Sequence, residues 1–220
     1  MVDSTQPTIS HLEQNQPSRL ELLNNVLRTL GAGPILHSNQ SGPAFYAHAA
    51  TSSGHVTWQT PKWLSKSLRN IFGIFDLDPC SPTDNRRKAP VRAKVLYTET
   101  DDGLALAWQG KVYVNPPYGR GIGRWIAKAH EEVLCGNAKL VVALIPARTD
   151  TKWWHKDLAG HADVFFLKGR LSFDDTGQSA PFPSALALWG TRASRLKALQ
   201  KALPDGWLAS AQAAARRSYY

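Results

Sequence analysis

Apolar and polar residues follow one another along this chain in blocks that predict strands and helices in turn. The run 140–145 is continuously apolar and ends at Pro146, which is typical of a central parallel strand covered on both faces. Shorter apolar runs predict further strands at 74–78, 95–98, 111–114, 164–167 and 185–189. With 220 residues the chain can bury a sizeable core in a single domain with extensions.

Apolar residues at helical spacing predict helices between these strands. Thr60 is a good N-cap with Pro61 at the first helical position, and Gly73 ends the helix that they begin. Further helices are predicted at 18–30, 122–134 and 150–158, and a mainly helical segment begins at Ala193, interrupted at 204–206. Because strands and helices alternate until the last two strands, we expect an α/β fold whose sheet is mostly parallel, with an antiparallel hairpin late in the chain.

Composition divides the chain into three parts. Residues 1–50 are expected to form an N-terminal extension with a disordered start, one helix and a linker. The main domain is predicted at 51–192, and a mainly helical, basic C-terminal tail at 193–220. No apolar run approaches the length of about 20 residues that crosses a bilayer, and the N-terminus has no signal pattern, so we expect a cytoplasmic location.

The charge favours a polyanionic partner, most simply nucleic acid. The formal net charge is +9 and the pI is about 9.7. Two basic groups stand out: Arg86, Arg87, Lys88, Arg92 and Lys94 in a predicted loop, and Arg192, Arg195, Lys197, Lys201, Arg216 and Arg217 near the C-terminus. The loop is the candidate for phosphate contact. A solvated helix face is the favoured interpretation of the C-terminal group.

Cysteine and histidine usage argues against a metal site. The two cysteines, Cys80 and Cys135, are far apart in the sequence, and the seven histidines are scattered. There is no C-x-x-C and no H-E-x-x-H, so we expect neither zinc nor a disulfide framework.

The stretch Asn115-Pro116-Pro117-Tyr118 carries the chemistry. Two prolines make a stiff turn at the end of a predicted strand, with an amide on one side and an aromatic ring on the other. Because ligands bind beyond the carboxyl ends of strands, a planar nitrogen group could be held between Asn115 and Tyr118. We interpret the turn as an amino-group methylation site; the alternative is a rigid loop that enters a helix.

The order of motifs resembles one family. Trp58-Gln-Thr-Pro61, Asp76-Leu-Asp-Pro-Cys80, Asp102-Gly-Leu104 with Trp108, Asn115-Pro-Pro-Tyr118, Ile145-Pro-Ala-Arg148 and Gly169-Arg-Leu-Ser-Phe173 follow one another as in the phage and prophage-type DNA N6-adenine methyltransferases, the phage Dam family. The resemblance covers about 52–190 and implies a methyltransferase catalytic domain with a Rossmann-like sheet that uses S-adenosylmethionine.

The resemblance also implies cofactor-binding residues. Asp78 ends the first strand of the domain and would hold the amino acid end of the cofactor, with Asp76 as a neighbouring candidate on the same face. Asp102 resembles the acidic residue that meets the cofactor's adenine. The usual glycine-rich loop is absent, and Asn85 is a candidate in the segment that replaces it. The full cofactor set is Trp58, Thr60, Pro61, Asp76, Asp78, Pro79, Asn85 and Asp102.

The expected reaction is direct methyl transfer to adenine N6 in DNA. The Asn115 side-chain oxygen and the Pro116 carbonyl would accept the two amine hydrogens, and Tyr118 would stack on a flipped-out base. Phe173 would supply a second contact or belong to the core, while Arg148 and Arg170 would meet phosphate or join ion pairs. RNA or a protein glutamine as substrate, and a nucleic-acid-binding protein with a decayed methyltransferase site, stay open as alternatives.

Overall fold

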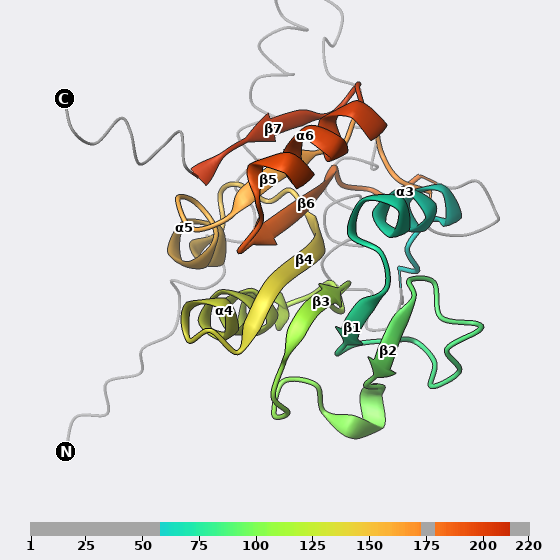
Figure 1. Ribbon diagram of the computed structural model, residues 1–220. Helices are drawn as coiled ribbons and strands as arrows, with labels where there is room; N and C mark the ends of the chain where they lie inside the picture. The colour runs from blue at the N-terminus through green and yellow to red at the C-terminus, as the bar shows by residue number, and fades with distance from the viewer. Residues whose placement is uncertain (1–57, 173–178, 212–220) are drawn as a thin grey trace, which may run out of the picture. The chain divides into compact units, whose positions relative to one another are not determined.

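The computed structural model describes residues 58–172 and 179–211, which all belong to one compact unit. Within this part of the chain, seven strands form one sheet in the order β2-β1-β3-β4-β6-β5-β7 (Figure 1). The strands are β1 (Phe75–Asp78), β2 (Ala93–Leu96), β3 (Gly110–Val114), β4 (Ala138–Pro146), β5 (Asp163–Phe166), β6 (Ser184–Trp189) and β7 (Trp207–Ala209). The helix predicted at 18–30 lies outside the described residues.

The sheet is parallel in its first half and antiparallel in its second. Strands β2, β1, β3 and β4 run parallel to one another. Strand β6 is inserted antiparallel between β4 and β5, and β5 pairs with β7, also antiparallel. The α/β class and the late hairpin, which is the β5–β6 pair, are therefore confirmed, while the prediction of a mostly parallel sheet holds for the first half only.

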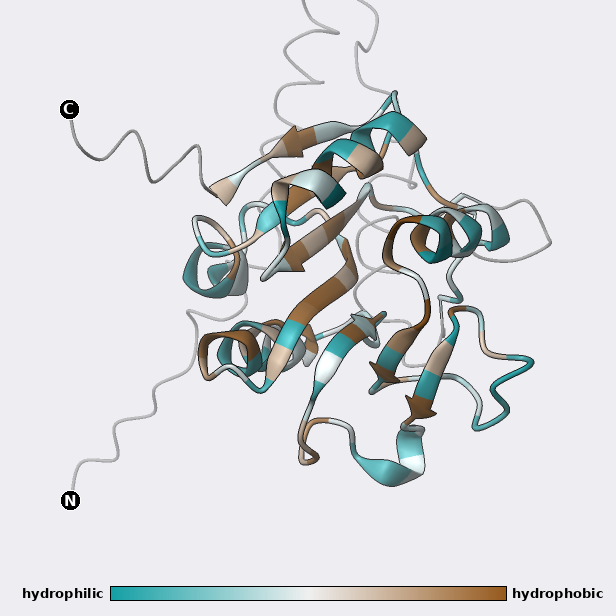
Figure 2. Cartoon of the chain, in the orientation of Figure 1, coloured by the Kyte–Doolittle hydropathy of each residue, from teal (hydrophilic) through white to brown (hydrophobic). Residues whose placement is uncertain are grey.

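Helices cover both faces of the sheet. Helices α3 (Lys62–Phe72) and α6 (Ala193–Ala202) pack into one apolar cluster, and α4 (Ile122–Leu134) and α5 (Lys152–Asp157) pack into another (Figure 1). The central strand β4 is buried from Leu140 to Pro146 because each face of the sheet meets one of these clusters. Figure 2 shows β4 and β6 as the most continuously hydrophobic strands of the molecule.

Residues 193–211 are less helical than predicted. Helix α6 ends at Ala202, and residues 207–209 then add the edge strand β7 to the sheet. Trp207 stacks on Phe166 with ring centroids 5.2 Å apart, and Gly206 lies so close to Phe165 that a Cβ there would be 2.3 Å from its ring. These contacts with β5 favour a strand over the helix that local sequence suggests.

Strand order reverses between β1 and β3. The chain passes from β1 to its neighbour β2 on one side, and then continues with β3 on the other side of β1. In open α/β sheets, the crevice beyond the carboxyl ends of the strands at such a reversal is where ligands bind. Asp78 ends β1 and Asn115 follows β3 directly, so the reversal brings these two candidates to the same edge of the sheet.

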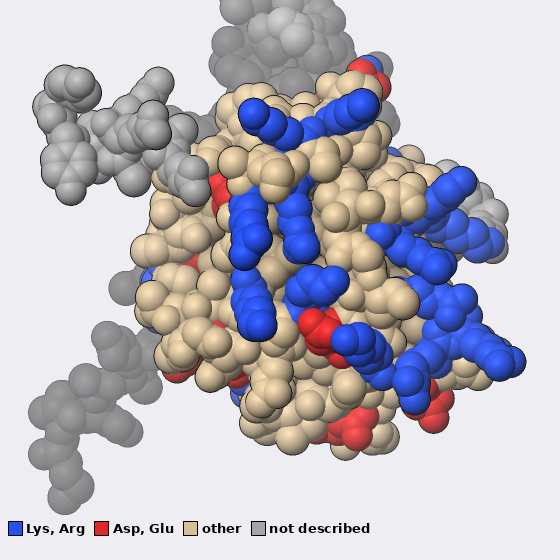
Figure 3. Space-filling view, in the orientation of Figure 1, with Lys and Arg blue, Asp and Glu red and all other residues tan. Residues whose placement is uncertain are grey.

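One face of the molecule is strongly basic. On the face shown in Figure 3, Lys and Arg side chains greatly outnumber Asp and Glu.

No described helix is long and apolar enough to cross a membrane. Among residues 58–172 and 179–211 there is also no cluster of His, Cys, Asp and Glu placed to hold a metal ion.

Candidate active site

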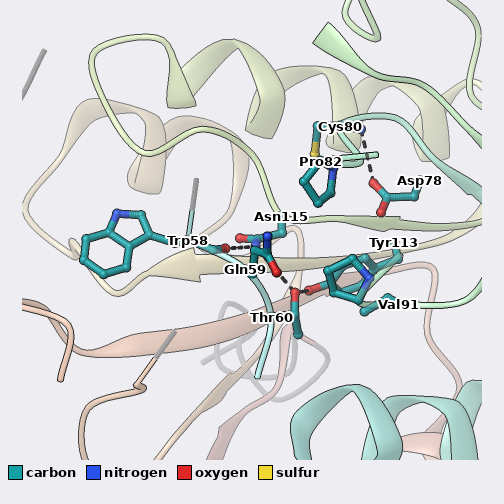
Figure 4. Close-up of a pocket in the computed structure, with 10 residues that line it drawn as sticks. Trp58, Gln59, Thr60, Asp78, Cys80, Pro82, Val91, Tyr113 and Asn115 are labelled. Carbon is teal, nitrogen blue, oxygen red and sulfur yellow. Dashed lines mark hydrogen bonds between the residues drawn. The ribbon is translucent and has the colours of Figure 1, made fainter. Parts of the chain in front are cut away.

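A pocket lies at the reversal between β1 and β3. It holds about 290 Å³ of empty space, part of it open to solvent, and its walls come from four segments that are distant in sequence (Figure 4). The lining residues are Trp58, Gln59, Thr60, Asp78, Cys80, Pro82, Pro90, Val91, Tyr113 and Asn115. Four of the predicted site residues, Trp58, Thr60, Asp78 and Asn115, therefore meet in one pocket.

The Asn115 amide is held in one orientation. Its Nδ2 donates to the Trp58 carbonyl oxygen and lies 3.4 Å from Thr60 Oγ1 (Figure 4). A flipped amide would set Oδ1 against the Trp58 carbonyl, which is also an acceptor, so this orientation is the favourable one. Asn115 Oδ1 is buried and has no hydrogen-bond partner among the described residues. A buried unpaired acceptor is costly, and it fits a ligand that brings an N–H donor.

Thr60 has a different task from the one predicted. The N-cap of α3 is Pro61, whose carbonyl accepts from the Ser65 N–H, so the prediction that Thr60 caps the helix is wrong. Thr60 Oγ1 instead lies 2.6 Å from the Tyr113 hydroxyl, in a buried hydrogen bond that ties the 58–60 segment to β3. The physical reason is the tertiary contact: Tyr113 is 1% exposed, and its hydroxyl needs a partner inside the protein.

Asp78 is a buried carboxyl on the pocket wall. It is 4% exposed, and within the described part of the chain no cation pairs with it. Burial raises the pKa of Asp78 from 3.8 to about 7, while the Cys80 backbone N–H, which donates to Asp78 Oδ1 at 3.2 Å, opposes that rise. A cationic ligand group beside Asp78 would stabilise its charged form.

Asp76 occupies a different environment. Its carboxylate accepts from the Lys111 backbone N–H and forms an ion pair with Lys94, both at 2.8 Å. The Lys111 N–H, followed by the Lys94 ammonium, lowers the pKa of Asp76. Asp76 does not line the pocket, so of the two candidate carboxyls the geometry favours Asp78.

Tyr118 packs against both apolar clusters of the core. Its hydroxyl donates to the Leu144 carbonyl at 3.2 Å, and its ring meets Phe182 edge-on with centroids 5.3 Å apart. Phe182 also contacts Trp58 edge-on, at 5.6 Å. Phe182 therefore links the Tyr118 turn to the segment that orients Asn115. Phe173, the aromatic proposed for this neighbourhood, lies outside the described residues.

The sequence matches the family described as DNA N-6-adenine-methyltransferase (Dam) over residues 49–188, which include every residue of the pocket. The chain belongs to this family. A relative, the DNA N-6-adenine-methyltransferase of Escherichia phage T1, is 28% identical over 123 residues, which are 54% of this chain and 48% of the phage protein. The chain thus spans about half the length of that relative.

One Dam-like motif has a structural explanation. Gly103, in the Asp102-Gly-Leu104 stretch, packs so tightly on the loop after β1 that a Cβ there would be 1.9 Å from the Pro79 carbonyl oxygen. The indole N–H of buried Trp108 donates to the Gly103 carbonyl at 2.8 Å. Asp102 itself is exposed, in left-handed conformation with φ 47°, and accepts from the Leu104 N–H. The motif therefore packs against Pro79, which lies between the wall residues Asp78 and Cys80, and Asp102 does not line the pocket.

The remaining predicted residues lie around the pocket. Asn85 is exposed and its side-chain oxygen already accepts from the Arg87 N–H at 3.0 Å, in a local turn. Arg86, Arg87 and Lys88 are exposed on the loop that carries the wall residues Pro82 and Pro90. Arg148 is half-buried just after β4, and Arg170 is exposed. Pro61, Pro79, Pro116 and Pro117 shape the backbone beside the pocket but do not line it.

Sequence reasoning missed several wall residues of this Dam-family pocket. Tyr113 could have been found, because it precedes Asn115, the first residue after β3, by two positions in extended chain, and residues at that spacing face the same side. Cys80 closes the wall next to Asp78; burial, then the Asp78 charge, raises the pKa of the Cys80 thiol, which stays protonated. Pro90 and Val91 carry no chemical signal, and only the fold brings them to the pocket.

Proposed function

We propose that this Dam-family protein transfers a methyl group from S-adenosylmethionine to the N6 amino group of adenine in DNA. The observation that carries the proposal is the Asn115 amide, whose buried Oδ1 lacks a partner among the described residues while Nδ2 is held by the Trp58 carbonyl. An acceptor fixed in this way suits an amino group that must lose its planarity before it can react.

The amine is a poor nucleophile because its lone pair is delocalised into the purine ring. Asn115 Oδ1 and the Pro116 carbonyl accept its two hydrogens, which favours a pyramidal nitrogen and directs the lone pair out of the ring plane. Catalysis of this kind depends on orientation and on fixed dipoles. The raised pKa of Cys80 keeps its thiol protonated, so the pocket offers no thiolate for a covalent intermediate.

The pocket fits the proposed methyl donor at its charged end. Asp78 is buried without a cationic partner in the described residues, and an amino group beside it would satisfy that carboxylate. S-adenosylmethionine supplies a methyl group already activated by its sulfonium. Asp78 would hold the amino acid end, and the 58–60 segment with Tyr113 would close the pocket over it. A Rossmann-like sheet is consistent with the parallel strands β2, β1, β3 and β4.

The substrate base must leave the duplex to reach Asn115. We assign the stacking contact to Tyr118, since its hydroxyl bond to Leu144 and its edge contact with Phe182 fix the plane of the ring. The exposed loop with Arg86, Arg87 and Lys88 borders the pocket and would contact phosphate.

The test is transfer of a labelled methyl group to unmethylated duplex DNA. Asn115→Ala should lower the rate of transfer by about 100-fold or more, the range for loss of one preorganised hydrogen-bonding group, whereas Gln109→Ala, at an exposed position just before β3, should leave it unchanged. Unchanged transfer by Asn115→Ala would remove the assigned role. In a cell extract, label that protease rather than nuclease releases would assign a protein glutamine substrate, and no cofactor binding by calorimetry would identify a decayed site.

A further inference from the structure

Helices α3 and α6 form a surface on which every charged side chain is basic. The two helices pack against each other on the same face of the sheet, with Arg195 of α6 lying 5.5 Å from the centre of the Phe72 ring of α3. Their charged residues are Lys62, Lys66, Arg69, Arg195, Lys197 and Lys201, and Arg192 precedes α6. We call this surface the α3–α6 face; it lies on the side of the molecule shown in Figure 3.

The helices on the other face of the sheet are charged differently. Helix α4 contains Lys128 and Glu132 four residues apart, in an ion pair of 2.7 Å, together with Glu131. Helix α5 has two lysines and the acidic Asp157, which faces His130 of α4 at 3.6 Å. Helices α4 and α5 thus carry acidic residues that offset part of their positive charge, whereas α3 and α6 carry none.

The basic residues of the α3–α6 face repel one another. Lys197 and Lys201 are four residues apart on α6, and like charges at this spacing destabilise a helix by roughly 0.2–0.5 kcal/mol per pair. Among the described residues, the acids that follow α3 and α6 most closely in the sequence pair with other cations, Asp76 with Lys94 and Asp205 with Lys168. A polyanion outside the molecule would offset the repulsion.

The dimensions suit DNA. Helix α3 has 11 residues and is therefore about 16 Å long, and a duplex presents roughly ten phosphate charges over that length, at one per about 1.7 Å. Helix α3 begins directly after the pocket residue Thr60 and Pro61, so the α3–α6 face starts beside the pocket. We propose that the α3–α6 face is a second DNA-backbone contact, which holds the duplex that flanks the flipped base. The proposal rests on the proposed function.

The test compares two variants that lose the same charge. Lys66→Gln/Lys197→Gln/Lys201→Gln removes three exposed charges from the α3–α6 face, and Arg124→Gln/Lys152→Gln/Lys156→Gln removes three exposed charges from α4 and α5. Duplex binding is measured against salt concentration. If each lysine meets a phosphate, the slope of log K against log salt falls by about 0.9 per contact, or about 2.7 for three. The control variant should keep the wild-type slope.

Folding and chemistry are followed separately. Cofactor binding and the rate of methyl transfer at saturating DNA should stay at wild-type values in both variants. Neither variant should melt below the wild type, since each loses a pair of lysines four residues apart on one helix. Equal slopes for the two variants would overturn the proposal while leaving the proposed function intact. Loss of binding to poly-glutamate with an unchanged DNA slope would assign the face to an acidic protein instead, which also overturns it. Absence of DNA binding by the wild type would refute the proposed function itself.

Discussion

Replacement of Asp78 by Asn should remove a pH-dependent cost of folding. The carboxyl is 4% exposed and its pKa is raised by burial from 3.8 to about 7. That shift of about three units corresponds to about 4 kcal/mol at 1.36 kcal/mol per unit, a large part of the 5–15 kcal/mol by which domains are stable. The amide in Asp78→Asn keeps the shape and an oxygen that can accept from Cys80, but it has no charge to bury.

The sign follows from the direction of the shift. The folded state binds the Asp78 proton more tightly than the unfolded state does. The free energy of unfolding that this proton contributes is therefore fully present below pH 3.8 and is lost as the pH rises through about 7. Without a bound ligand, the free energy of unfolding of the wild type should therefore fall by about 4 kcal/mol relative to Asp78→Asn between about pH 4 and pH 8, the variant being the more stable at pH 8.

The assay is urea denaturation of both proteins at half-unit intervals of pH, in the absence of cofactor. Asp76→Asn serves as the control with the opposite sign: the pKa of Asp76 is lowered, so its contribution is present above pH 3.8 and is lost as the pH falls. A difference between wild type and Asp78→Asn that does not change with pH would refute the account of Asp78 as a buried, uncompensated carboxyl.

Three further outcomes follow from the pocket and its supports. Tyr113→Phe deletes the hydroxyl that lies 2.6 Å from Thr60 Oγ1 and should cost about 1 kcal/mol of the free energy of unfolding, measured by denaturation. It should also lower kcat for methyl transfer, with little change in KM for DNA. A change in KM alone would contradict a role of Tyr113 in orienting Asn115. Gly103→Ala places a Cβ 1.9 Å from the Pro79 carbonyl oxygen and should cost about 1–3 kcal/mol, whereas Gly119→Ala, with open space around it, should melt close to wild type; similar melting of the two would contradict the tight packing of Gly103. With iodoacetamide, the thiol of half-buried Cys80, whose pKa is raised, should react more slowly than that of exposed Cys135, as peptide mapping by mass spectrometry would show; faster labelling of Cys80 would contradict the raised pKa of its thiol.

Local pattern predicted the elements well where the pattern is itself the cause of the structure. The apolar run 140–145 falls within β4 because a strand covered on both faces must be apolar throughout. The helix between Pro61 and Gly73 was predicted because proline at its start and a positive-φ glycine after its end act within a few residues. Such short-range causes are visible in the sequence.

Long-range contacts set what the sequence left open. Thr60 was predicted to cap a helix because nothing local reveals its partner Tyr113, 53 residues away. Asp76 and Asp78 share a face of β1, so the sequence does not distinguish them. In the structure the carboxylate of Asp76 contacts Lys94 and the Lys111 N–H, which leaves Asp78 as the carboxyl on the pocket wall. Strand β7 depends on contacts with β5, which its own three residues do not encode.

The hydrogen bond between the Trp58 carbonyl and the Asn115 amide has a consequence for truncation. A fragment that starts at Pro61 would keep all seven strands and all four described α-helices, and with them every buried residue of both apolar clusters. The fragment would nevertheless lose the Trp58 carbonyl and Thr60 Oγ1, which accept from the Asn115 amide, so the Asn115 side chain would be free to rotate. The elements of the fold therefore begin after Pro61, whereas the groups that orient Asn115 begin at Trp58.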